Sequence, residues 1–460
     1  AGESGVGAAL LAKQRGFDVF VSDAGAISAK YESELKSANI SYEQNGHTEA
    51  LVLNADEIIK SPGIPEKATL IKKIRTQNIS IISEVEFAFR FIGNSKVIAI
   101  TGSNGKTTVT QMIASVLRAD PAAPSLSTQG NLNNDIGVPL TLFNLRPDHQ
   151  RAVVELGMNH PGEIEVLAQF AQPTIGLVNN AQREHQEFMC TVEAVAIENG
   201  EVIRALPAKG VAVFPAQDAY TELWQKLAGA RQVLTFGLTQ GDVQAHDIVW
   251  RNGAWSFQLW TPQAALACRL NIAGRHNILN ALAATACALA AGMSLPVIVK
   301  GLESFEPVKG RSKSCEWQID GHALTLIDDT YNANPDSVRA AIEVLAELPA
   351  PRLLVLGDMG EVGLQGAEFH EEVGAYAHAS GIQTLFTLGD LCRHSSQVFA
   401  GAKHFSDMES LQAKVLSEIS TYNSVLVKGS RFMKMERVVD ALRNKLEQTQ
   451  ASERESAHAA

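Results

Sequence analysis

Short apolar runs alternate along this chain with longer stretches of helical periodicity, a pattern that predicts parallel α/β units. At the start, a glycine turn leads into a helix, and strand-like runs follow at 17–23, 51–59 and 79–83. We therefore expect a small α/β unit over residues 1–95. Because a glycine turn of this kind normally follows a strand, the sequence also predicts that the chain begins inside a β-α-β unit.

The same alternation predicts two further units. The second, over 96–312, begins with an apolar strand, a glycine-rich turn and a helix. It continues with strands at 151–156, 174–180 and 210–216, an antiparallel stretch at 231–272 and a helix at 276–291. The third, over 313–448, has predicted strands at 323–328, 352–357, 383–388 and 424–428. The polar tail, 449–460, has the composition of a disordered segment.

Composition narrows the class of protein. The chain has 460 residues, too many for one core, and 45% of them are hydrophobic, as in ordinary globular proteins. A net charge of −11 argues against a nucleic-acid-binding protein, which needs a basic face. No apolar run reaches the ~20 residues that span a bilayer, and no signal-peptide pattern is present. Five scattered cysteines without a CxxC pair indicate reduced thiols. We expect a cytoplasmic, monomeric protein with no membrane insertion.

The segment ITGSNGKTT (100–108) carries the strongest chemical signal. An apolar strand leads into a glycine-rich turn whose backbone N–H groups can surround phosphate oxygens, and the next helix adds its dipole. Lys106 can reach the β- and γ-phosphates, and Thr107 is placed to bind Mg²⁺. The general loop has a glycine where this chain has Ile100, so the segment fits a family-specific variant. The predicted ATP-binding residues of this loop are Gly102, Ser103, Asn104, Gly105, Lys106, Thr107 and Thr108.

Phosphoryl transfer also needs metal ligands near the γ-phosphate. Glu155 ends the predicted strand RAVVEL, and His185 follows the strand TIGLVNN. A lone glutamate or histidine is more often an ordinary polar residue, but ligands of open α/β sheets bind at the carboxyl ends of strands. The sequence therefore predicts a Mg²⁺ site at Thr107, Glu155 and His185. The predicted catalytic residues are Lys106, Glu155 and His185.

Eight motifs follow one another between residues 96 and 440. They are TGSNGKTT (101–108), QGNLNNDIGVPLTL (129–142), VVELGMNHPGEI (153–164), NNAQREHQEF (179–188), GRHNILNALAA (274–284), DDTYNANPDS (328–337), LGDMGEVG (356–363) and VKGSRFMKMERVV (427–439). This series resembles the Mur ligase family, above all its D-alanyl-D-alanine-adding members. The resemblance implies a Rossmann-like N-terminal domain, a phosphate-loop central domain with a parallel sheet, and a Rossmann-like C-terminal domain.

The resemblance also implies an activity. Such enzymes use ATP and Mg²⁺ to join D-alanyl-D-alanine to UDP-N-acetylmuramoyl-tripeptide through an acyl phosphate, a step of peptidoglycan precursor synthesis. Asn277 would face the adenine, with Asn280 one turn along the same helix, although helix capping is a competing role for Asn277. The turn after the last strand (428–431) would meet the dipeptide, or can simply be exposed. The remaining implied residues are Arg311, Asp328 and Asn334 for the nucleotide, Ser337, Lys428, Ser430 and Arg431 for the dipeptide, and Asn131 for the UDP-sugar.

The first 95 residues resemble a different branch of the family. GESGVGAALLAKQRGFDVFVSD (2–23) and IIKSPGIP (58–65) are similar to the UDP-binding domain of the D-glutamate-adding members. We therefore interpret the chain as a hybrid of two branches of the family, either natural or engineered. A glycine pattern alone is equally compatible with a tight turn. By this resemblance the UDP-sugar site would include Gly2, Ser4, Gly5, Gly7, Asp23, Ser61, Pro62 and Gly63.

Position 199 is a second departure from the pattern of the family. Many Mur ligases have a lysine, often carbamylated, in the segment that corresponds to AIENGEVI (196–203), where this chain has Asn199. Glu198 or Glu201 is a candidate replacement as an anionic metal partner. The two departures leave three functions open. They are a D-alanyl-D-alanine-adding ligase, which the C-terminal motifs favour, a D-glutamate-adding ligase acting on UDP-N-acetylmuramoyl-L-alanine, and an ATP-binding protein with little or no ligase turnover.

Overall fold

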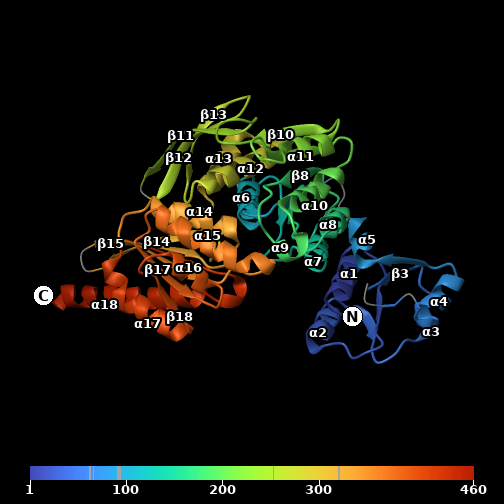
Figure 1. The fold of residues 1–460 in the computed structure, drawn as a ribbon. Helices are drawn as coiled ribbons and strands as arrows, with labels where there is room; N and C mark the ends of the chain where they lie inside the picture. Colours follow the sequence, from blue (N-terminus) through green and yellow to red (C-terminus); the bar gives the residue numbers. More distant parts are fainter. Residues whose placement is uncertain are drawn as a thin grey trace.

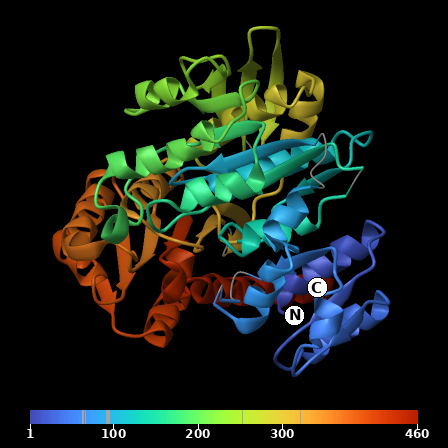
Figure 2. The same ribbon diagram turned by 90° about the vertical axis from the view of Figure 1, so that its right-hand side faces the viewer.

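The computed structural model describes residues 1–61, 64–65, 67–90, 95–146, 148–251, 253–319 and 322–459. Strands and helices form three successive units, and in Figure 1 the second unit lies between the first, at the right, and the third, at the left. Figure 2 shows the first unit below the strands and helices of the second. Strands alternate with helices in all three units, so the predicted α/β class is confirmed. No helix in the described ranges is both long and apolar enough to cross a membrane.

Two parallel strand pairs build the first unit. β1 pairs with β2 and β3 pairs with β4, as separate two-stranded sheets. The run 51–59, predicted as one strand, is divided between a helix and a strand because Asn-Ala-Asp at 54–56 interrupts the apolar pattern. The elements are α1 (Glu3–Gln14), β1 (Phe20–Ser22), α2 (Ala29–Ser37), β2 (Ser41–Glu43), α3 (Glu49–Val52), β3 (Glu57–Lys60), α4 (Thr69–Thr76), β4 (Ser80–Ser83) and α5 (Glu84–Phe89).

Six parallel strands form the sheet of the second unit, in the order β10-β9-β8-β5-β7-β6. Its middle strands are almost wholly apolar and buried, because helices cover both faces. α6 packs with α12 and α13 on one side, and α8 with α10 on the other. The elements are β5 (Lys96–Thr101), α6 (Lys106–Arg118), β6 (Ser125–Ser127), α7 (Gly137–Phe143), β7 (Arg151–Glu155), α8 (Glu163–Ala171), β8 (Ile175–Val178), α9 (Gln186–Met189), α10 (Val192–Arg204), β9 (Val211–Pro215), α11 (Thr221–Ala228), β10 (Gln232–Phe236), α12 (His276–Ala290) and α13 (Leu295–Glu303).

The stretch 231–272 is predicted to be antiparallel throughout, and this prediction is wrong at its first strand. β10 pairs parallel with β9 and joins the central sheet. The three strands that follow do form an antiparallel sheet, as predicted. Alternation of apolar and polar residues identifies a strand but not its partner. The antiparallel strands are β11 (Gln244–Arg251), β12 (Ala254–Trp260) and β13 (Ala265–Leu270).

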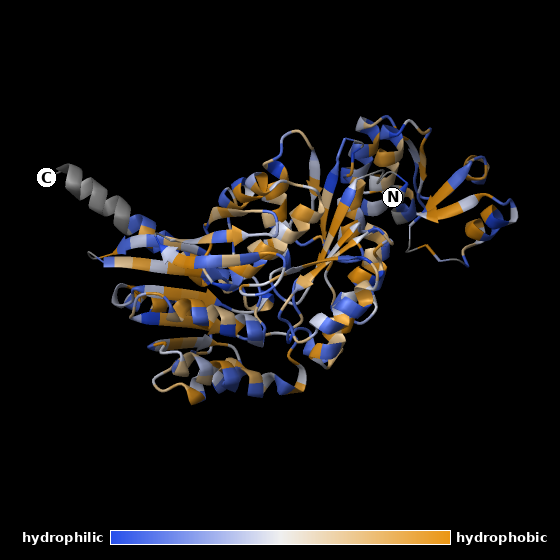
Figure 3. Ribbon diagram, turned by 90° about the horizontal axis from the view of Figure 1, so that it is seen from above, coloured by the Kyte–Doolittle hydropathy of each residue, from blue (hydrophilic) through white to orange (hydrophobic). Residues whose placement is uncertain are grey.

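The third unit contains a second six-stranded sheet, in the order β14-β15-β19-β16-β17-β18. Of the strand pairs described in this sheet, only the β14–β15 hairpin is antiparallel. Figure 3 shows hydrophobic residues along the strands of the units and polar residues on the outer helix surfaces. The elements are β14 (Lys313–Ile319), β15 (His322–Asp329), α14 (Pro335–Ala346), β16 (Arg352–Gly357), α15 (Gly366–Ala379), β17 (Thr384–Leu388), α16 (Cys392–Val398), β18 (Lys403–Phe405), α17 (Met408–Glu418), β19 (Ser424–Lys428) and α18 (Glu436–Ala459).

The last helix differs from the sequence prediction. α18 spans Glu436–Ala459, so it continues through most of the tail that the sequence predicts to be disordered. Alanine and glutamate, which have high helix propensity, make up half of this tail. A polar composition indicates exposure, but it does not by itself exclude a helix.

Candidate active site

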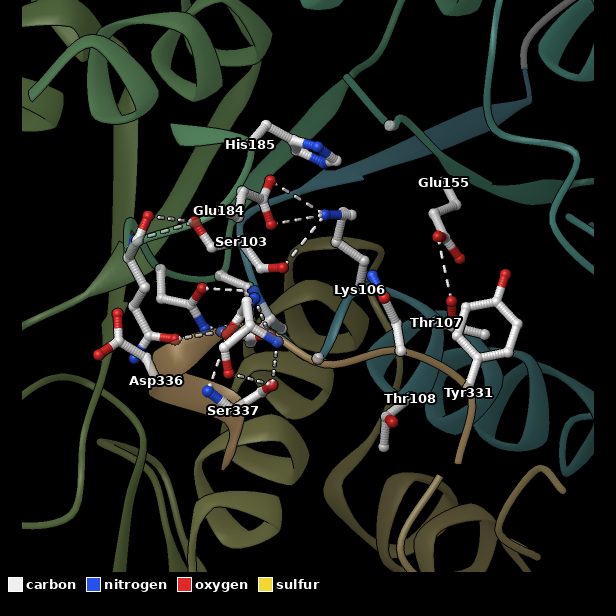
Figure 4. A pocket seen from close by; sticks show the side chains of 18 of the residues that line it. Ser103, Lys106, Thr107, Thr108, Glu155, Glu184, His185, Tyr331, Asp336 and Ser337 are labelled. Atoms are coloured by element: carbon white, nitrogen blue, oxygen red, sulfur yellow. Dashed lines mark hydrogen bonds and ion pairs between the residues drawn. The ribbon is translucent and has the colours of Figure 1, made fainter. Parts of the chain in front are cut away.

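A cleft of about 1570 Å³ lies where the carboxyl ends of the central sheet face the third unit. The phosphate-loop segment, the ends of β7 and β8, and the first turn of α12 form one wall. The loop before α14 and the turn after β19 form the opposite wall (Figure 4). No described residue before Ser103 lines this cleft, so the first unit stands apart from it. Most of the residues that the sequence predicts for the site do line this cleft. They are Ser103, Asn104, Gly105, Lys106, Thr107, Thr108, Asn131, Glu155, His185, Asn277, Asn280, Arg311, Asn334, Ser337, Lys428, Ser430 and Arg431.

The phosphate loop has the backbone that its glycines predict. Gly102 and Gly105 both have positive φ, +135° and +82°, and α6 begins directly after them at Lys106. A Cβ at Gly105 would lie 2.4 Å from Oδ1 of Asn280 and 2.7 Å from Nδ2 of Asn179. The turn therefore needs glycine for its backbone conformation and for the close approach of two asparagine side chains. Gly102 itself does not line the cleft but shapes the turn.

Replacing Gly105 with alanine is expected to lower ATP affinity at least ~10-fold, since the loop must shift away from Asn179 and Asn280. Titration calorimetry with a non-hydrolysable ATP analogue would measure this loss. Gly401→Ala is the matched control, because Gly401 has the same φ of +82°, but a Cβ there would meet no described atom within 4 Å. Equal affinity of the wild type and the Gly105 variant would contradict this role for the close approach.

Lys106 is held in place by its own loop and by a carboxylate that the sequence prediction missed. Its Nζ donates to the backbone oxygens of Gly102 and Ser103, and it lies 3.4 Å from both carboxylate oxygens of Glu184 (Figure 4). Burial raises the pKa of Glu184, while the Lys106 ammonium opposes that shift. Glu184 follows a strand end, directly before His185, so the strand-end argument applied to His185 could also have identified it.

Glu155, at the end of β7, contacts Thr107 of the phosphate loop. Oε1 of Glu155 accepts hydrogen bonds from Thr107 Oγ1 at 3.1 Å and from Asn133 Nδ2 at 3.0 Å. Glu155 is only 2% exposed, and its other oxygen, Oε2, is buried without a hydrogen-bond partner among the described residues. A buried carboxylate oxygen without a donor, beside a hydroxyl and a phosphate loop, fits an oxygen-ligated divalent cation such as Mg²⁺.

His185 lines the same cleft from the N-terminal end of α9. Its Nδ1 forms an ion pair with Glu361 of the third unit, and this contact lowers the pKa of Glu361. The backbone N–H of Glu187 also donates to the Glu361 carbonyl oxygen, at 3.4 Å. Sequence analysis does not predict Glu361, because no local pattern links the GDMGE turn with a residue of another unit.

Position 199 is filled by a neutral, buried side chain. Asn199 is 0% exposed, and its Oδ1 accepts a hydrogen bond of 2.6 Å from Thr101 Oγ1. The two carboxylate oxygens of Glu198 accept from the backbone N–H groups of Gly162 and Ile164 at the start of α8. Glu201 pairs instead with Arg204 on its own helix. The suggested replacement of the missing lysine by Glu198 or Glu201 is therefore not supported by their contacts.

The start of α12 carries two buried asparagines into the cleft. Asn280 Nδ2 donates to Asn277 Oδ1 at 2.8 Å, and Asn277 Nδ2 donates to the carbonyl oxygen of Ala273 at 2.7 Å. Arg275 occupies the N-cap position of this helix, so Asn277 is not its cap. Asn280 Oδ1 accepts from Asn179 Nδ2 at 3.0 Å, and Asn179 Nδ2 also donates to the carbonyl oxygen of Asn104 in the phosphate loop at 2.8 Å.

Asp328 does not line the cleft, contrary to its predicted contact with the nucleotide. It is 0% exposed and accepts hydrogen bonds from the backbone N–H of Gly310 and from Thr330 Oγ1. Its neighbour Asp329 lines the cleft instead, because successive side chains of a strand point to opposite faces. Asp328 therefore fixes the connection between the second and third units. Arg311 does line the cleft, with its guanidinium 4.0 Å from the Tyr331 ring centroid.

The residues predicted to meet the dipeptide have different surroundings. Lys428 is 3% exposed and forms an ion pair with Asp329, at 2.5 Å. Burial alone would raise the pKa of Asp329, but the Lys428 ammonium brings that pKa below its ordinary value. Ser430 is buried between Gly360 and Ala333. Arg431 is exposed and lies over the Tyr331 ring, at 6.0 Å, so it is the most accessible of this group.

Asn334 and Ser337 form the N-terminal cap of α14. Asn334 Oδ1 accepts from the Ser337 backbone N–H at 2.8 Å, and Ser337 Oγ completes a capping box with the Asn334 backbone. Asn334 Nδ2 also donates to Asn104 Oδ1 of the phosphate loop, at 3.1 Å. The cap therefore brings the start of α14 against the predicted nucleotide site.

The candidate UDP-sugar residues of the first unit form a separate group. Gly2 is the N-cap of α1, and Ser4, Gly5 and Gly7 lie within that helix rather than in a turn. A Cβ at Gly7 would lie 3.0 Å from the Phe143 ring, so this glycine allows α1 to pack on α7 instead of opening a phosphate site. Asp23 accepts a hydrogen bond from the backbone N–H of Gly25 at 2.8 Å. The hydroxyl groups of Ser61 and Ser4 both donate to the carboxylate of Glu84. Pro62 and Gly63 lie outside the described residues.

Three family profiles match the chain. They are the Mur ligase middle domain over residues 100–288, the Mur ligase glutamate ligase domain over 315–431, and the MurD N-terminal domain over 7–70. The last match confirms the predicted difference between the first unit and the remainder of the chain.

Known proteins are similar to most of the chain. UDP-N-acetylmuramoyl-tripeptide–D-alanyl-D-alanine ligase of Escherichia coli (strain K12) is 40% identical over 352 residues, covering 76% of this chain and 77% of that protein. The ligase of the same name from Haemophilus influenzae is 38% identical over 361 residues, covering 77% and 78%. A crystal structure of MurF from Acinetobacter baumannii superposes with a TM-score of 0.75 at 32% identity, covering 92% of this chain and 90% of that one. The cleft, the three profiles and these relatives together show that the chain belongs to the Mur ligase family.

Proposed function

We propose that this protein is an ATP-dependent ligase that joins D-alanyl-D-alanine to the terminal carboxylate of UDP-N-acetylmuramoyl-tripeptide. The observation that carries the proposal is a cleft in which Lys106, Thr107 and Glu155 of the second unit face the third unit. The names of the relatives supply the substrates, and a cleft of about 1570 Å³ between the units has room for a nucleotide and a peptide terminus together.

In the proposed reaction, the acceptor carboxylate attacks the γ-phosphorus of ATP, and ADP leaves. The dipeptide amine then attacks the acyl phosphate carbon, loses a proton and displaces phosphate, which leaves the new amide bond. Lys106, fixed by Gly102 and Ser103, would stabilise the negative charge that develops on the transferred phosphoryl group. The fixed positions of these side chains would contribute by orienting the reactants.

Thr107 and Glu155 are the residues that would hold Mg²⁺, through a hydroxyl oxygen and the unpartnered Oε2. A bound Mg²⁺ would neutralise phosphate charge and orient the β- and γ-phosphates. His185 remains a proposed member of this site, although in the structure its Nδ1 is paired with Glu361. Asn277 would face the adenine of the nucleotide, and Asn280, one turn along α12, lies against Gly105 of the phosphate loop.

The test is phosphate release from ATP with Mg²⁺ and UDP-N-acetylmuramoyl-tripeptide, with and without D-alanyl-D-alanine. Tripeptides that end in diaminopimelate and in lysine are both supplied, since the third residue is open. Release that requires both the tripeptide and the dipeptide would support the proposal. Release with D-glutamate and UDP-N-acetylmuramoyl-L-alanine instead would refute it and assign specificity to the first unit, which matches the MurD N-terminal domain. If the protein binds ATP but releases no phosphate with any acceptor, the proposal fails, and the protein is a nucleotide-binding protein without ligase turnover.

A further inference from the structure

Arg183 connects the second unit to the third through a double ion pair. It lies in the segment between β8 and α9, and its guanidinium contacts two carboxylates of the third unit. Nη2 lies 2.6 Å from Oδ1 of Asp336, and Nε lies within 3.2 Å of both Asp336 oxygens. Nη1 and Nη2 lie 2.6 and 3.0 Å from the two oxygens of Glu372. One side chain therefore pairs bidentately with two different helices, α14 and α15.

The surroundings of these pairs favour a defined geometry over a mobile surface contact. The side chains of Arg183, Asp336 and Glu372 are 24%, 23% and 29% exposed. The Arg183 guanidinium lies 5.3 Å from the Phe369 ring centroid, and the Arg183 backbone N–H donates to Asp336 at 2.9 Å. Bidentate, partly buried arginine–carboxylate pairs are stronger and more directional than exposed lysine pairs.

The same segment is bonded to the phosphate loop. Gln182, directly before Arg183, accepts a hydrogen bond from Asn104 Nδ2 at 2.6 Å, and its backbone N–H donates to Ser103 Oγ. Asn104 in turn contacts Asn334, the cap of α14. Asp336 lies in the first turn of that helix. The phosphate loop, the Arg183 segment and the start of α14 thus form one closed set of contacts.

We propose that Arg183 is a positioning residue that latches the third unit onto the second, so that nucleotide affinity at the phosphate loop depends on its pairs with Asp336 and Glu372. The nucleotide part of this inference rests on the proposed function, whereas the latch itself does not. Without the latch, the third-unit wall of the cleft is free to move away. A nucleotide that contacts both walls then binds only the fraction of molecules that are closed.

Arg183→Gln tests the latch, and Arg339→Gln is its matched control. Arg339 also pairs with Glu372, at 2.8 Å, but both residues belong to the third unit, so that pair does not cross between units. Two measurements are made on the full chain: the radius of gyration by small-angle X-ray scattering without nucleotide, and the affinity for a non-hydrolysable ATP analogue with Mg²⁺ by calorimetry. For Arg183→Gln we expect a larger radius of gyration and ~10-fold weaker binding. Arg339→Gln should leave both close to wild type.

Further variants separate positioning from a general loss of structure. Arg183→Lys keeps the charge but not the fork geometry, so it should give intermediate values. Arg183→Gln should raise the KM for ATP more than it lowers kcat, with an unchanged thermal unfolding midpoint. An unchanged radius of gyration in Arg183→Gln would overturn the latch. A larger radius with unchanged nucleotide affinity would overturn its coupling to the nucleotide. If the wild type itself does not bind the analogue, the proposed function fails, and the radius of gyration still decides the latch.

Discussion

Replacing Lys106 with alanine should lower ADP formation by roughly 10³-fold, because the γ-phosphoryl group loses a positioned cation in a partly buried site. Steady-state ADP release with saturating ATP, tripeptide and dipeptide measures the effect. The exposed Lys209→Ala is the matched control and should retain wild-type activity. Residual activity within ~10-fold of wild type would show that Lys106 does not contact the transferred group.

Loss of Lys106 also has a structural consequence, which needs its own control. Lys106 pairs with the buried Glu184 carboxylate, and removing one partner of a buried pair leaves the other charge uncompensated. Lys106→Ala combined with Glu184→Gln removes both charges. If both the single and the double variant fold like wild type but lack activity, the defect lies in the chemistry. If only the double variant recovers activity, the defect in the single variant comes from the unpaired carboxylate.

Replacing Glu155 with glutamine should lower activity by ~10²-fold and weaken Mn²⁺ or Mg²⁺ binding by ~10- to 100-fold. The amide can still accept from Thr107 and Asn133, but it is a poorer ligand for a hard divalent cation than the carboxylate with its unpartnered Oε2. Electron paramagnetic resonance with Mn²⁺ measures cation binding without turnover, and ADP release measures activity.

The exposed Glu165→Gln, on α8, is the control for a change of one carboxylate to an amide. It should bind Mn²⁺ like wild type. A Glu155→Gln variant that binds Mn²⁺ with wild-type affinity would move the cation site away from the end of β7. Activity at higher Mg²⁺ concentration should recover partly in Glu155→Gln if cation affinity is the main defect.

The local sequence predicts those parts of the site that are formed by one strand and the turn that follows it. The apolar strand before Gly102 and the helix from Lys106 follow from hydrophobic pattern and glycine positions, and the structure contains both. The positions of Glu155 and His185 after apolar strands predict that both face the site, and both line the cleft. These predictions depend only on residues near each other in the chain.

Predictions that depend on which side of a sheet a residue faces, or on which distant residue it contacts, are less accurate than those from local sequence. Asp328 and Asp329 are adjacent in β15, and only the observed pairing of that strand shows that Asp329 faces the cleft. The resemblance implies that Lys428 meets the dipeptide; in the structure it lines the cleft, and only the fold shows that it is paired there with Asp329. Similarly, β10 has the pattern of a strand, but its parallel pairing with β9 depends on the path of the chain between them.

The sequence by itself determined the α/β class, the phosphate loop and the residues at the ends of β7 and β8, because these follow from periodicity and short-range backbone geometry. Only the tertiary structure decided which side chains far apart in the chain meet. Glu184 lies beside Lys106, Glu361 beside His185, and Arg183 between α14 and α15. The physical reason is that such contacts depend on the relative position of elements as far as 230 residues apart in the chain, as for Asn104 and Asn334, which no local pattern specifies.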